Sequence, residues 1–308
     1  MSAEGSSKAI FAALAANLGI AVAKFVAFAF TGSTSMMAEG VHSVADSGNQ
    51  ALLIVGRKRS ERDRTPEHQF GYGRERYFYA FIVAVVLFTV GSLFSLYEGW
   101  HKVANPHPVE DAGWAFAVLI LGIVLEGYSF RTAIKESNPL RGTRSWSSFI
   151  RRAKAPELPV VLLEDFAALI GLVLALAGIV LAVATGNGAW DGVGSMAIGV
   201  LLGFVAIVLA VETKSLLIGE SAHGDVQRQI AEALADGDEV ERIIHLRTQH
   251  IGPEELLVAA KIAVHHDDTA VDVARGINAA EKRIRAAVPM ATYIYLEPDI
   301  YSATRAAE

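Results

Sequence analysis

The chain of 308 residues contains no cysteine. Disulfide bonds, CxxC redox chemistry and metal sites built on thiolates are therefore excluded. The sequence also lacks an HExxH metalloprotease motif, a GxSxG nucleophile turn and a glycine-rich phosphate loop. These absences argue against the common hydrolases and nucleotide-dependent enzymes, and we expect that the chain is not an enzyme.

Charged residues are also scarce, at 19% of the chain, whereas 52% of the residues are hydrophobic and the mean hydropathy is +0.36. This composition is too apolar for an ordinary soluble protein and indicates an integral membrane protein with a polar remainder. The first residues, MSAEGSSKAIF, include one basic residue and run directly into an apolar segment. We therefore expect no cleaved signal peptide.

The net charge of −6 lies in the last part of the chain. Residues 222–308 carry nine Lys and Arg against fifteen Asp and Glu, while the charges of residues 1–221 cancel. An acidic segment of this kind does not suit a nucleic-acid partner and would attract cations.

Six apolar segments are long enough to cross a bilayer, which takes about 20 residues each. They are Lys8–Phe30, Ser35–Val55, Tyr77–Tyr97, Gly113–Ala133, Pro159–Ala184 and Gly192–Leu217. The pattern predicts an all-α bundle of six transmembrane helices over residues 1–221, followed by a separate domain over residues 222–308.

Basic residues are concentrated in two of the connecting loops. The second loop holds Arg57, Lys58, Arg59, Arg62, Arg64, Arg74 and Arg76, and the fourth holds Arg141, Arg144, Arg151, Arg152 and Lys154. The first, third and fifth loops hold only Lys102. By the positive-inside rule both termini are cytoplasmic, and we expect the location to be a bacterial plasma membrane.

The second apolar segment is interrupted by five polar side chains: Glu39, His42, Asp46, Asn49 and Gln50. An ionisable group at the bilayer centre costs about 2.5–3.5 kcal/mol, and such groups usually face a bundle interior or a water-filled cavity. His42 and Asp46 are four residues apart, so on a helix they lie one turn apart on one face. An imidazole and a carboxylate in this arrangement can share a divalent metal ion. The alternative is a bond between the two side chains without metal.

The fifth apolar segment carries Glu164 and Asp165, which point about 100° apart around a helix and can border one polar cavity. We predict both as metal ligands beside His42 and Asp46, against the alternative of an acid pair at the membrane surface. The first segment carries Asn17 and Lys24, which more readily serve helix packing and a structural ion pair. The role of Glu126 in the fourth segment stays open.

The last part of the chain predicts a small α+β domain with the order αββαβ, of ferredoxin-like type. The expected elements are helices Val226–Ala235 and Ala270–Ala287, and strands Val240–Thr248, Leu256–Val264 and Thr292–Leu296. The run His265-His266-Asp267-Asp268 at a strand edge is either a weak metal site or a solvated loop. His68, before the third apolar segment, more readily caps a turn than binds metal.

Several motifs together resemble the cation diffusion facilitator family of metal transporters, over nearly the whole chain. They are GSTSMMAEGVHSVADSGNQ, HQFGYGRERY, LLEDFAALIG, DGVGSMAIGVLL, SLLIGES and YLEPDI, in this order. HSVADSGNQ, YGRERY and VVLLEDFAA are most similar to the branch that includes zinc transporter 9.

This resemblance implies a homodimer with six transmembrane helices and a cytoplasmic ferredoxin-like domain, which exchanges divalent cations, commonly zinc, for protons. It places metal ligands on His42, Asp46 and Asp165. The family's fourth ligand falls on Val161, which cannot bind metal, and Glu164 is the candidate replacement. The usual regulatory metal ligands fall on Tyr295-Leu296-Glu297 and Ala260, so the domain is expected to pair two protomers without those sites.

The leading hypothesis is a proton-coupled transporter that exports a divalent cation by alternating access. Zinc is the first candidate, with manganese, iron and cobalt open, because one histidine with carboxylates and no sulfur is a comparatively hard site. The expected partners are the cation, protons, lipid and a second copy of the chain, with no other cofactor and no nucleic acid. The alternatives are a metal-responsive sensor or scaffold without transport, and a membrane metal-dependent hydrolase with Glu164 as base.

Overall fold

The computed structural model describes residues 2–31, 34–107 and 112–301, without the side chains of residues 2–6, 30, 31, 34–39, 41, 42 and 112. The chain forms two compact units. The first comprises Met1–Glu61 and Glu75–Lys214, and the second comprises Arg62–Arg74 and Ser215–Glu308. We expected a division between residues 221 and 222, so the observed second unit begins earlier and includes a loop that lies between two apolar segments.

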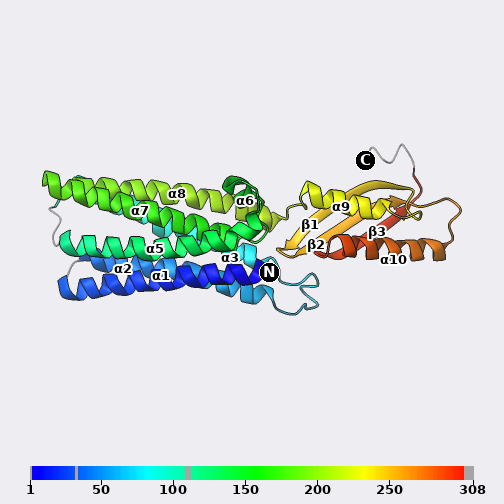
Figure 1. Cartoon of the computed structure of the whole chain (residues 1–308), viewed down its shortest axis with the longest axis horizontal. Helices are drawn as coiled ribbons and strands as arrows, with labels where there is room; N and C mark the ends of the chain where they lie inside the picture. The colour runs from blue at the N-terminus through cyan, green and yellow to red at the C-terminus, as the bar shows by residue number, and fades with distance from the viewer. Residues whose placement is uncertain (1, 32–33, 108–111, 302–308) are drawn as a thin grey trace. The chain divides into compact units, whose positions relative to one another are not determined.

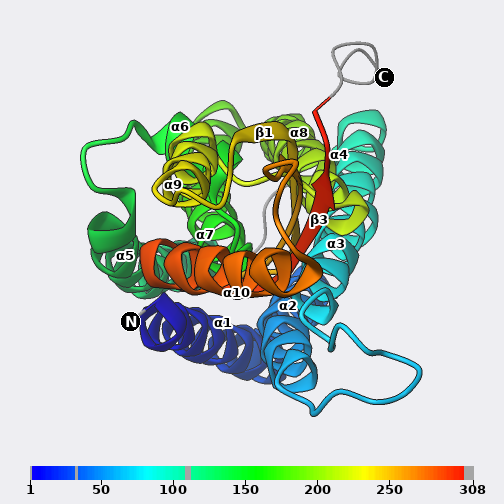
Figure 2. The same cartoon turned by 90° about the vertical axis from the view of Figure 1, so that its right-hand side faces the viewer.

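The first unit is a bundle of long helices that run side by side (Figure 1). In chain order they are α1 (Ser2–Thr31), α2 (Thr34–Ser60), α3 (Glu75–Val86), the π-helical segment η1 (Leu87–Leu93), α4 (Phe94–Ala104), α5 (Ala112–Arg141), the short α6 (Trp146–Arg152), α7 (Glu157–Thr185) and α8 (Ala189–Ile218). Figure 2, turned by 90°, looks along these helices. We call the end where α2 finishes the basic end, because its last turn carries Arg57, Lys58 and Arg59.

Five of these helical stretches are long and apolar enough to cross a membrane: Ser7–Ala29, Glu75–Ala104, Gly113–Arg141, Glu157–Thr185 and Ala189–Ile218. We expected six transmembrane helices, and five such helices are found within the described residues. The exception is α2, which is helical over 27 residues and packs against α1 and α3. Its polar groups lower its hydropathy, which is the feature that made this segment a site candidate.

The apolar centre of the bundle is formed by side chains from most of its helices. Leu53 of α2, Val83 of α3, Val160 of α7 and Leu209 of α8 are all at most 4% exposed and belong to one cluster. The membrane-length stretch Glu75–Ala104 contains the π-helical η1 at its middle, which the sequence did not predict. Such π-helical insertions occur often at functional sites, because they redirect the side chains of one turn.

The second unit has the predicted order of elements: α9 (Gly224–Ala235), β1 (Arg242–Gly252), β2 (Glu255–Ala263), α10 (Ala270–Ala287) and β3 (Ala291–Asp299). The sheet order is β1-β2-β3, with β1 and β2 antiparallel and β2 and β3 parallel. Alternate residues of β2, from Leu256 to Ile262, are buried in a cluster with Ile230 of α9 and Ile284 of α10. The two helices therefore cover one face of the sheet.

Residues 62–74 contact the rest of the second unit through β2 and β3. Arg64 lies 3.7 Å from Glu255 and places its guanidinium 4.7 Å from the centre of the Tyr293 ring. Phe70 meets the same ring edge to face at 5.1 Å. Tyr293 pairs with Leu257, which alternates with the residues covered by the helices, so the loop lies on the other face of the sheet.

Candidate metal site

A cavity of about 200 Å³ lies inside the first unit. Its lining comes from α1, α2, η1, α4, α5, α7 and α8. The polar and charged members are Asn17, Lys24, Ser43, Asp46, Ser95, Glu98, Lys102, Glu126, Glu164, Asp165 and Ser195. A cavity with this many ionisable groups inside an apolar bundle is the feature that the sequence predicted.

Three of the four predicted ligands line this cavity. Asp46 reaches it from α2, and Glu164 and Asp165 reach it from α7. Glu164 and Asp165 are 5% and 1% exposed, so both carboxylates are buried inside the bundle. His42 lies one turn before Asp46 on α2, but its side chain is outside the described residues.

Asp165 is fixed by a hydrogen bond from a neighbouring helix. The hydroxyl of Ser129 on α5 donates to Asp165 Oδ2 at 2.6 Å, and Ser129 is fully buried. Ser129 could not be predicted from the sequence, since a serine in an apolar helix gives no pattern that points to a partner on another helix.

Glu164 is held by two amides of α2. Asn49 Nδ2 donates to Glu164 Oε1 and Gln50 Nε2 donates to Oε2, both at 2.8 Å. Asn17 Nδ2 of α1 in turn donates to Gln50 Oε1 at 3.3 Å. This chain of amides ties α1, α2 and α7 together at the cavity wall. Each carboxylate oxygen keeps a lone pair for a further donor or a metal ion.

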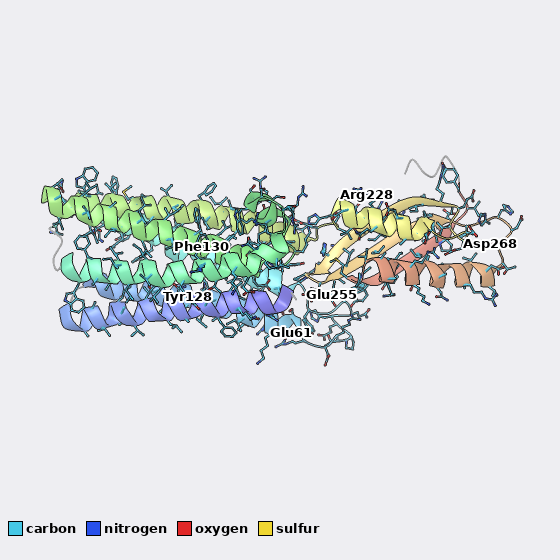
Figure 3. The ribbon with its side chains drawn as sticks, in the orientation of Figure 1. Glu61, Tyr128, Phe130, Arg228, Glu255 and Asp268 are labelled. Atoms are coloured by element: carbon cyan, nitrogen blue, oxygen red, sulfur yellow. The ribbon has the colours of Figure 1, made fainter. Side chains whose placement is uncertain are left out.

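Glu126 and Lys24 add charge of both signs to the wall. Glu126 of α5 is buried and lines the cavity, whereas Tyr128, two residues on, lies on the exposed face of the same helix (Figure 3). Lys24 Nζ donates to the Ser43 hydroxyl at 3.0 Å. The expectation that Lys24 serves contacts between helices agrees with this bond from α1 to α2.

The carboxylates surround the cavity without forming a closed metal cluster. Asp46, Glu126, Glu164 and Asp165 all line it, and like charges in such surroundings repel strongly, which a divalent cation would relieve. Among the side chains that the structure describes, no three His, Asp or Glu come together closely enough to hold a metal ion. Val161, at the family's fourth ligand position, is fully buried and apolar.

The two other candidate positions have contacts of their own. The His68 ring stacks on Tyr72 at 4.5 Å, and its amide donates to the Thr65 carbonyl, as expected for a turn residue. His265 Nε2 donates to the Asp238 carbonyl at 2.8 Å. This bond, with the charges of Asp268 and Glu241, raises the pKa of His265 above its usual value.

The chain matches the family model of the cation efflux transmembrane domain over residues 10–218. It is 33% identical over 262 residues to the mitochondrial proton-coupled zinc antiporter SLC30A9 of Xenopus laevis and 30% identical over 261 residues to that of Homo sapiens. It is 32% identical over 259 residues to metal tolerance protein C4 of Arabidopsis thaliana. These matches cover 84%, 84% and 83% of this chain, and 47%, 46% and 57% of the relatives.

The chain thus spans about half the length of the curated relatives it matches. Their names describe transporters, which agrees with the expectation that the chain is not an enzyme. The same names contradict the expected bacterial plasma membrane, because the zinc antiporters matched over most of this chain are called mitochondrial. The expectation of membrane integration stands on the five apolar helices. On the family model and these relatives, the chain belongs to the cation diffusion facilitator family of cation efflux proteins, near the branch of zinc transporter 9.

Proposed function

We propose that this chain carries a divalent cation, zinc first, across a membrane through the cavity of its helical bundle. The observation that carries the proposal is that Asp46 of α2 lines the same cavity as Glu164 and Asp165 of α7. Carboxylates are costly inside a membrane and mark ion paths. The names of the relatives, which are zinc antiporters, support zinc as the cargo.

The proposed ligands are His42, Asp46 and Asp165, completed by Glu164 or by water. Zinc prefers four ligands in a tetrahedron and tolerates a water as the fourth. In the described conformation the carboxylates are apart, so the binding conformation requires α2 and α7 to bring them together. We propose α2 as a sixth transmembrane helix, whose polar face is sheltered by α1, α3 and the cavity.

Proton coupling follows from the chemistry of these ligands. An imidazole must be neutral and a carboxylate deprotonated to bind metal, so cation and proton compete for the same groups. A cavity that opens to one side and then the other would load metal where protons are scarce and release it where they are plentiful. This gives antiport by alternating access.

The second unit is proposed as a ferredoxin-like regulatory domain that pairs two protomers. Its order αββαβ with a three-stranded sheet supports this assignment. Two such domains of net negative charge repel each other, so we expect divalent cations in solution to strengthen the pairing.

The test is metal flux into sealed liposomes that contain the purified full chain. Zn²⁺, Mn²⁺, Fe²⁺ and Co²⁺ are compared with and without a pH gradient. Transport predicts Zn²⁺ flux that rises when the metal-receiving side is more acidic, and that vanishes for Asp165→Asn. A chain that binds Zn²⁺ and passes no ion under any gradient would be a sensor or scaffold, and the proposal would be wrong.

A further inference from the structure

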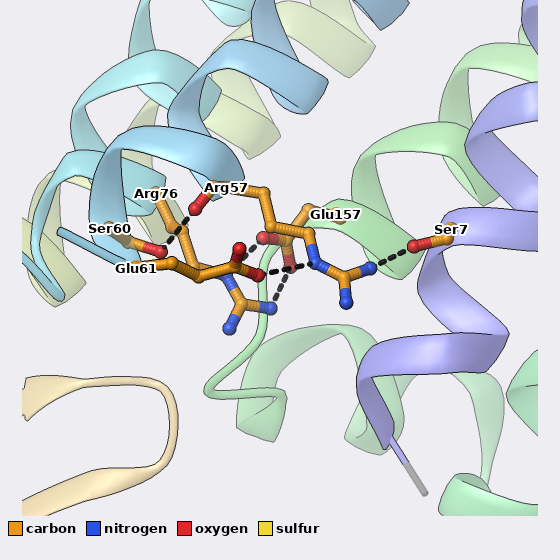
Figure 4. A network of polar contacts seen from close by, with 6 residues as sticks. All are labelled: Ser7, Arg57, Ser60, Glu61, Arg76 and Glu157. Carbon is orange, nitrogen blue, oxygen red and sulfur yellow. Dashed lines mark hydrogen bonds and ion pairs between the residues drawn. The ribbon is translucent and has the colours of Figure 1, made fainter.

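A buried ion pair joins the first turns of α3 and α7 at the basic end of the bundle (Figure 4). Arg76 Nη2 donates to Glu157 Oε2 at 2.9 Å, and Arg76 Nε donates to Glu157 Oε1. The side chains of Arg76 and Glu157 are 8% and 1% exposed. The planar guanidinium and the carboxylate therefore meet through two parallel bonds.

A pair of this kind is difficult to explain as a source of stability. Removing two charges from water costs much of what their attraction returns, and well-packed apolar side chains in the same place are often as good or better. The neighbouring pair Arg57–Glu61 shows the contrast, since it is single and its side chains are 23% and 64% exposed. The buried pair accordingly indicates a role that needs charge at this position.

The pair lies beyond the part of α7 that lines the cavity, on nearly the same face of that helix. On α7 the cavity lining extends from Glu164 to Ala175, and on the α3–α4 stretch from Leu87 to Lys102. Glu157 precedes Glu164 by seven residues, which is about two turns and about 10.5 Å along nearly the same face of the helix. The cavity therefore stops short of the basic end and continues toward the opposite end.

The stretch of α7 between Glu157 and Glu164 is apolar and buried. Leu158, Val160, Val161 and Leu162 lie between Glu157 and Glu164 on α7 and are at most 6% exposed. At the opposite end the cavity reaches Lys102, whose amine lies 2.8 Å from Asp191 Oδ2 with both side chains partly exposed. The lining of the cavity thus ends before the basic end on α7 and extends to partly exposed residues at the other end.

We propose that Arg76 and Glu157 form the gate at the basic end, and that Glu157 binds the divalent cation on its way between this end and the cavity. This inference rests on the proposed function, because it gives the gate its cargo. With the gate closed, the guanidinium supplies the positive charge that the Glu157 carboxylate needs. When α3 and α7 separate, a buried carboxylate without its partner is costly, and a divalent cation can take the place of the guanidinium. Glu157 and Glu164 then stand two turns apart as successive carboxylates.

The absence of native cysteine allows the gate to be measured directly. Ala168 lines the cavity on α7 and is not a proposed metal ligand, so Ala168→Cys reports access to the cavity. Glu67→Cys, in the loop beyond α2, reports which end faces the reagent in each liposome preparation. An impermeant thiol reagent is then applied from each side of sealed liposomes, without metal.

With the native gate, Ala168→Cys should react from the end opposite to the loop. Adding Arg76→Gln or Glu157→Gln should raise its reaction from the basic end by about tenfold, the change that a shift of about 1.4 kcal/mol in the gate equilibrium gives. The exchanged pair Arg76→Glu with Glu157→Arg should restore the native profile. The control Arg57→Gln changes a cation at the same end that contacts Ser7 and Glu61, and it should leave the profile unchanged.

The ion-binding part has a separate readout. In the Arg76→Gln background Zn²⁺ applied from the basic end should slow the reaction of Ala168→Cys, and adding Glu157→Gln should remove most of that protection. If the reaction of Ala168→Cys from each end is unchanged in folded Arg76→Gln protein, the proposed gate is wrong. If Zn²⁺ protects Ala168→Cys equally with and without Glu157→Gln, Glu157 is not a ligand. Access is measured without transport. Wild-type protein that passes no metal would therefore refute the proposed function, whereas the gate is tested by the labelling result alone.

Discussion

Asp165 is the predicted ligand whose surroundings the structure defines most closely. The bond from Ser129 holds a buried carboxylate that has one α5 donor on Oδ2 and the cavity beside it. Groups that orient a metal ligand often matter nearly as much as the ligand. Ser129 is accordingly expected to act on metal binding through Asp165, as a positioning residue.

We predict that Ser129→Ala weakens Zn²⁺ binding by about 10- to 100-fold, the usual cost of losing a residue that orients a ligand. Titration of the purified full chain with Zn²⁺ measures the effect. Thr132→Ala is the matched control, since Thr132 lies on the same helix and donates its hydroxyl to the Tyr128 carbonyl at an exposed position. Equal affinity of Ser129→Ala and the control would remove Ser129 from the site.

Glu164 is the residue whose role has two readings. It can complete the metal site, or it can only fasten α7 to α2 through Asn49 and Gln50. We predict that Glu164→Gln lowers Zn²⁺ affinity and shifts the pH dependence of transport, because an amide neither carries charge nor releases a proton. Val161→Ala should do neither. If both variants bind and transport like the wild type, the site has three protein ligands and a water.

The candidate site was predictable from sequence to the extent that polar residues inside apolar segments can be recognised in the sequence. The convergence of Asp46, Glu164 and Asp165 followed from helical spacing and from the cost of burying charge. The donors Ser129, Asn49 and Gln50 could not be assigned in advance, because their partners lie on other helices and single-sequence patterns carry no distances between helices. Asn49 and Gln50 were noticed as polar, and only the fold shows that they hold Glu164.

At the scale of elements, the loop of residues 62–74 departs most from expectation. Its glycines and its His68 predicted turns, and the structure confirms a turn at His68. Its place in the second unit depends on Arg64 and Phe70 meeting Tyr293, more than 200 positions later in the chain. Long-range contacts of this kind leave no local signal, and the same limit explains why η1 was missed. The periodic helices and the αββαβ order have local signals and were predicted.

This loop gives a pH-dependent prediction. Burial raises the pKa of Glu255 above its usual value, while the Arg64 guanidinium partly opposes the rise. A carboxyl whose folded pKa is raised favours the folded state below its unfolded pKa, and this contribution is lost as the pH rises through the folded pKa. Arg64→Ala should therefore destabilise the second unit more at pH 7 than at pH 4, by less than about 1 kcal/mol because the pair is partly exposed.

Hydrogen exchange of peptides from β2 and β3, corrected for intrinsic rates, measures this difference in the full chain. Arg62→Ala is the control, because no contact with Glu255 or Tyr293 is described for it. An Arg64→Ala effect that is equal at both pH values would show that the ring contact with Tyr293, and not the ion pair, holds the loop.

At the scale of the whole chain, the proposed sidedness of the bundle requires α2 to cross the membrane as a sixth span. Asn105 follows α4 and Asn187 precedes α8, whereas Glu67 lies between α2 and α3. Single cysteines at Lys8, near the start of α1, and at Glu67 should react with an impermeant reagent from the same face of the membrane, because α1 and α2 both cross between them. Single cysteines at Asn105 and Asn187 should react from the other face. If the cysteines at Lys8 and Glu67 react from opposite faces, α2 does not span, and the bundle has five crossings up to α8.

We propose above all that the carboxylates of α2 and α7 together bind the transported ion. The most direct measurement is equilibrium Zn²⁺ binding to the purified full chain, compared with Asp46→Ala, Asp165→Ala and the double variant. Asp267→Ala with Asp268→Ala, in the exposed loop of the second unit, is the control. We predict that Asp46→Ala and Asp165→Ala each lose the same tight Zn²⁺-binding site and that the double variant loses no further binding. The control should keep the tight site. Tight binding that survives in Asp46→Ala or Asp165→Ala would contradict this proposal.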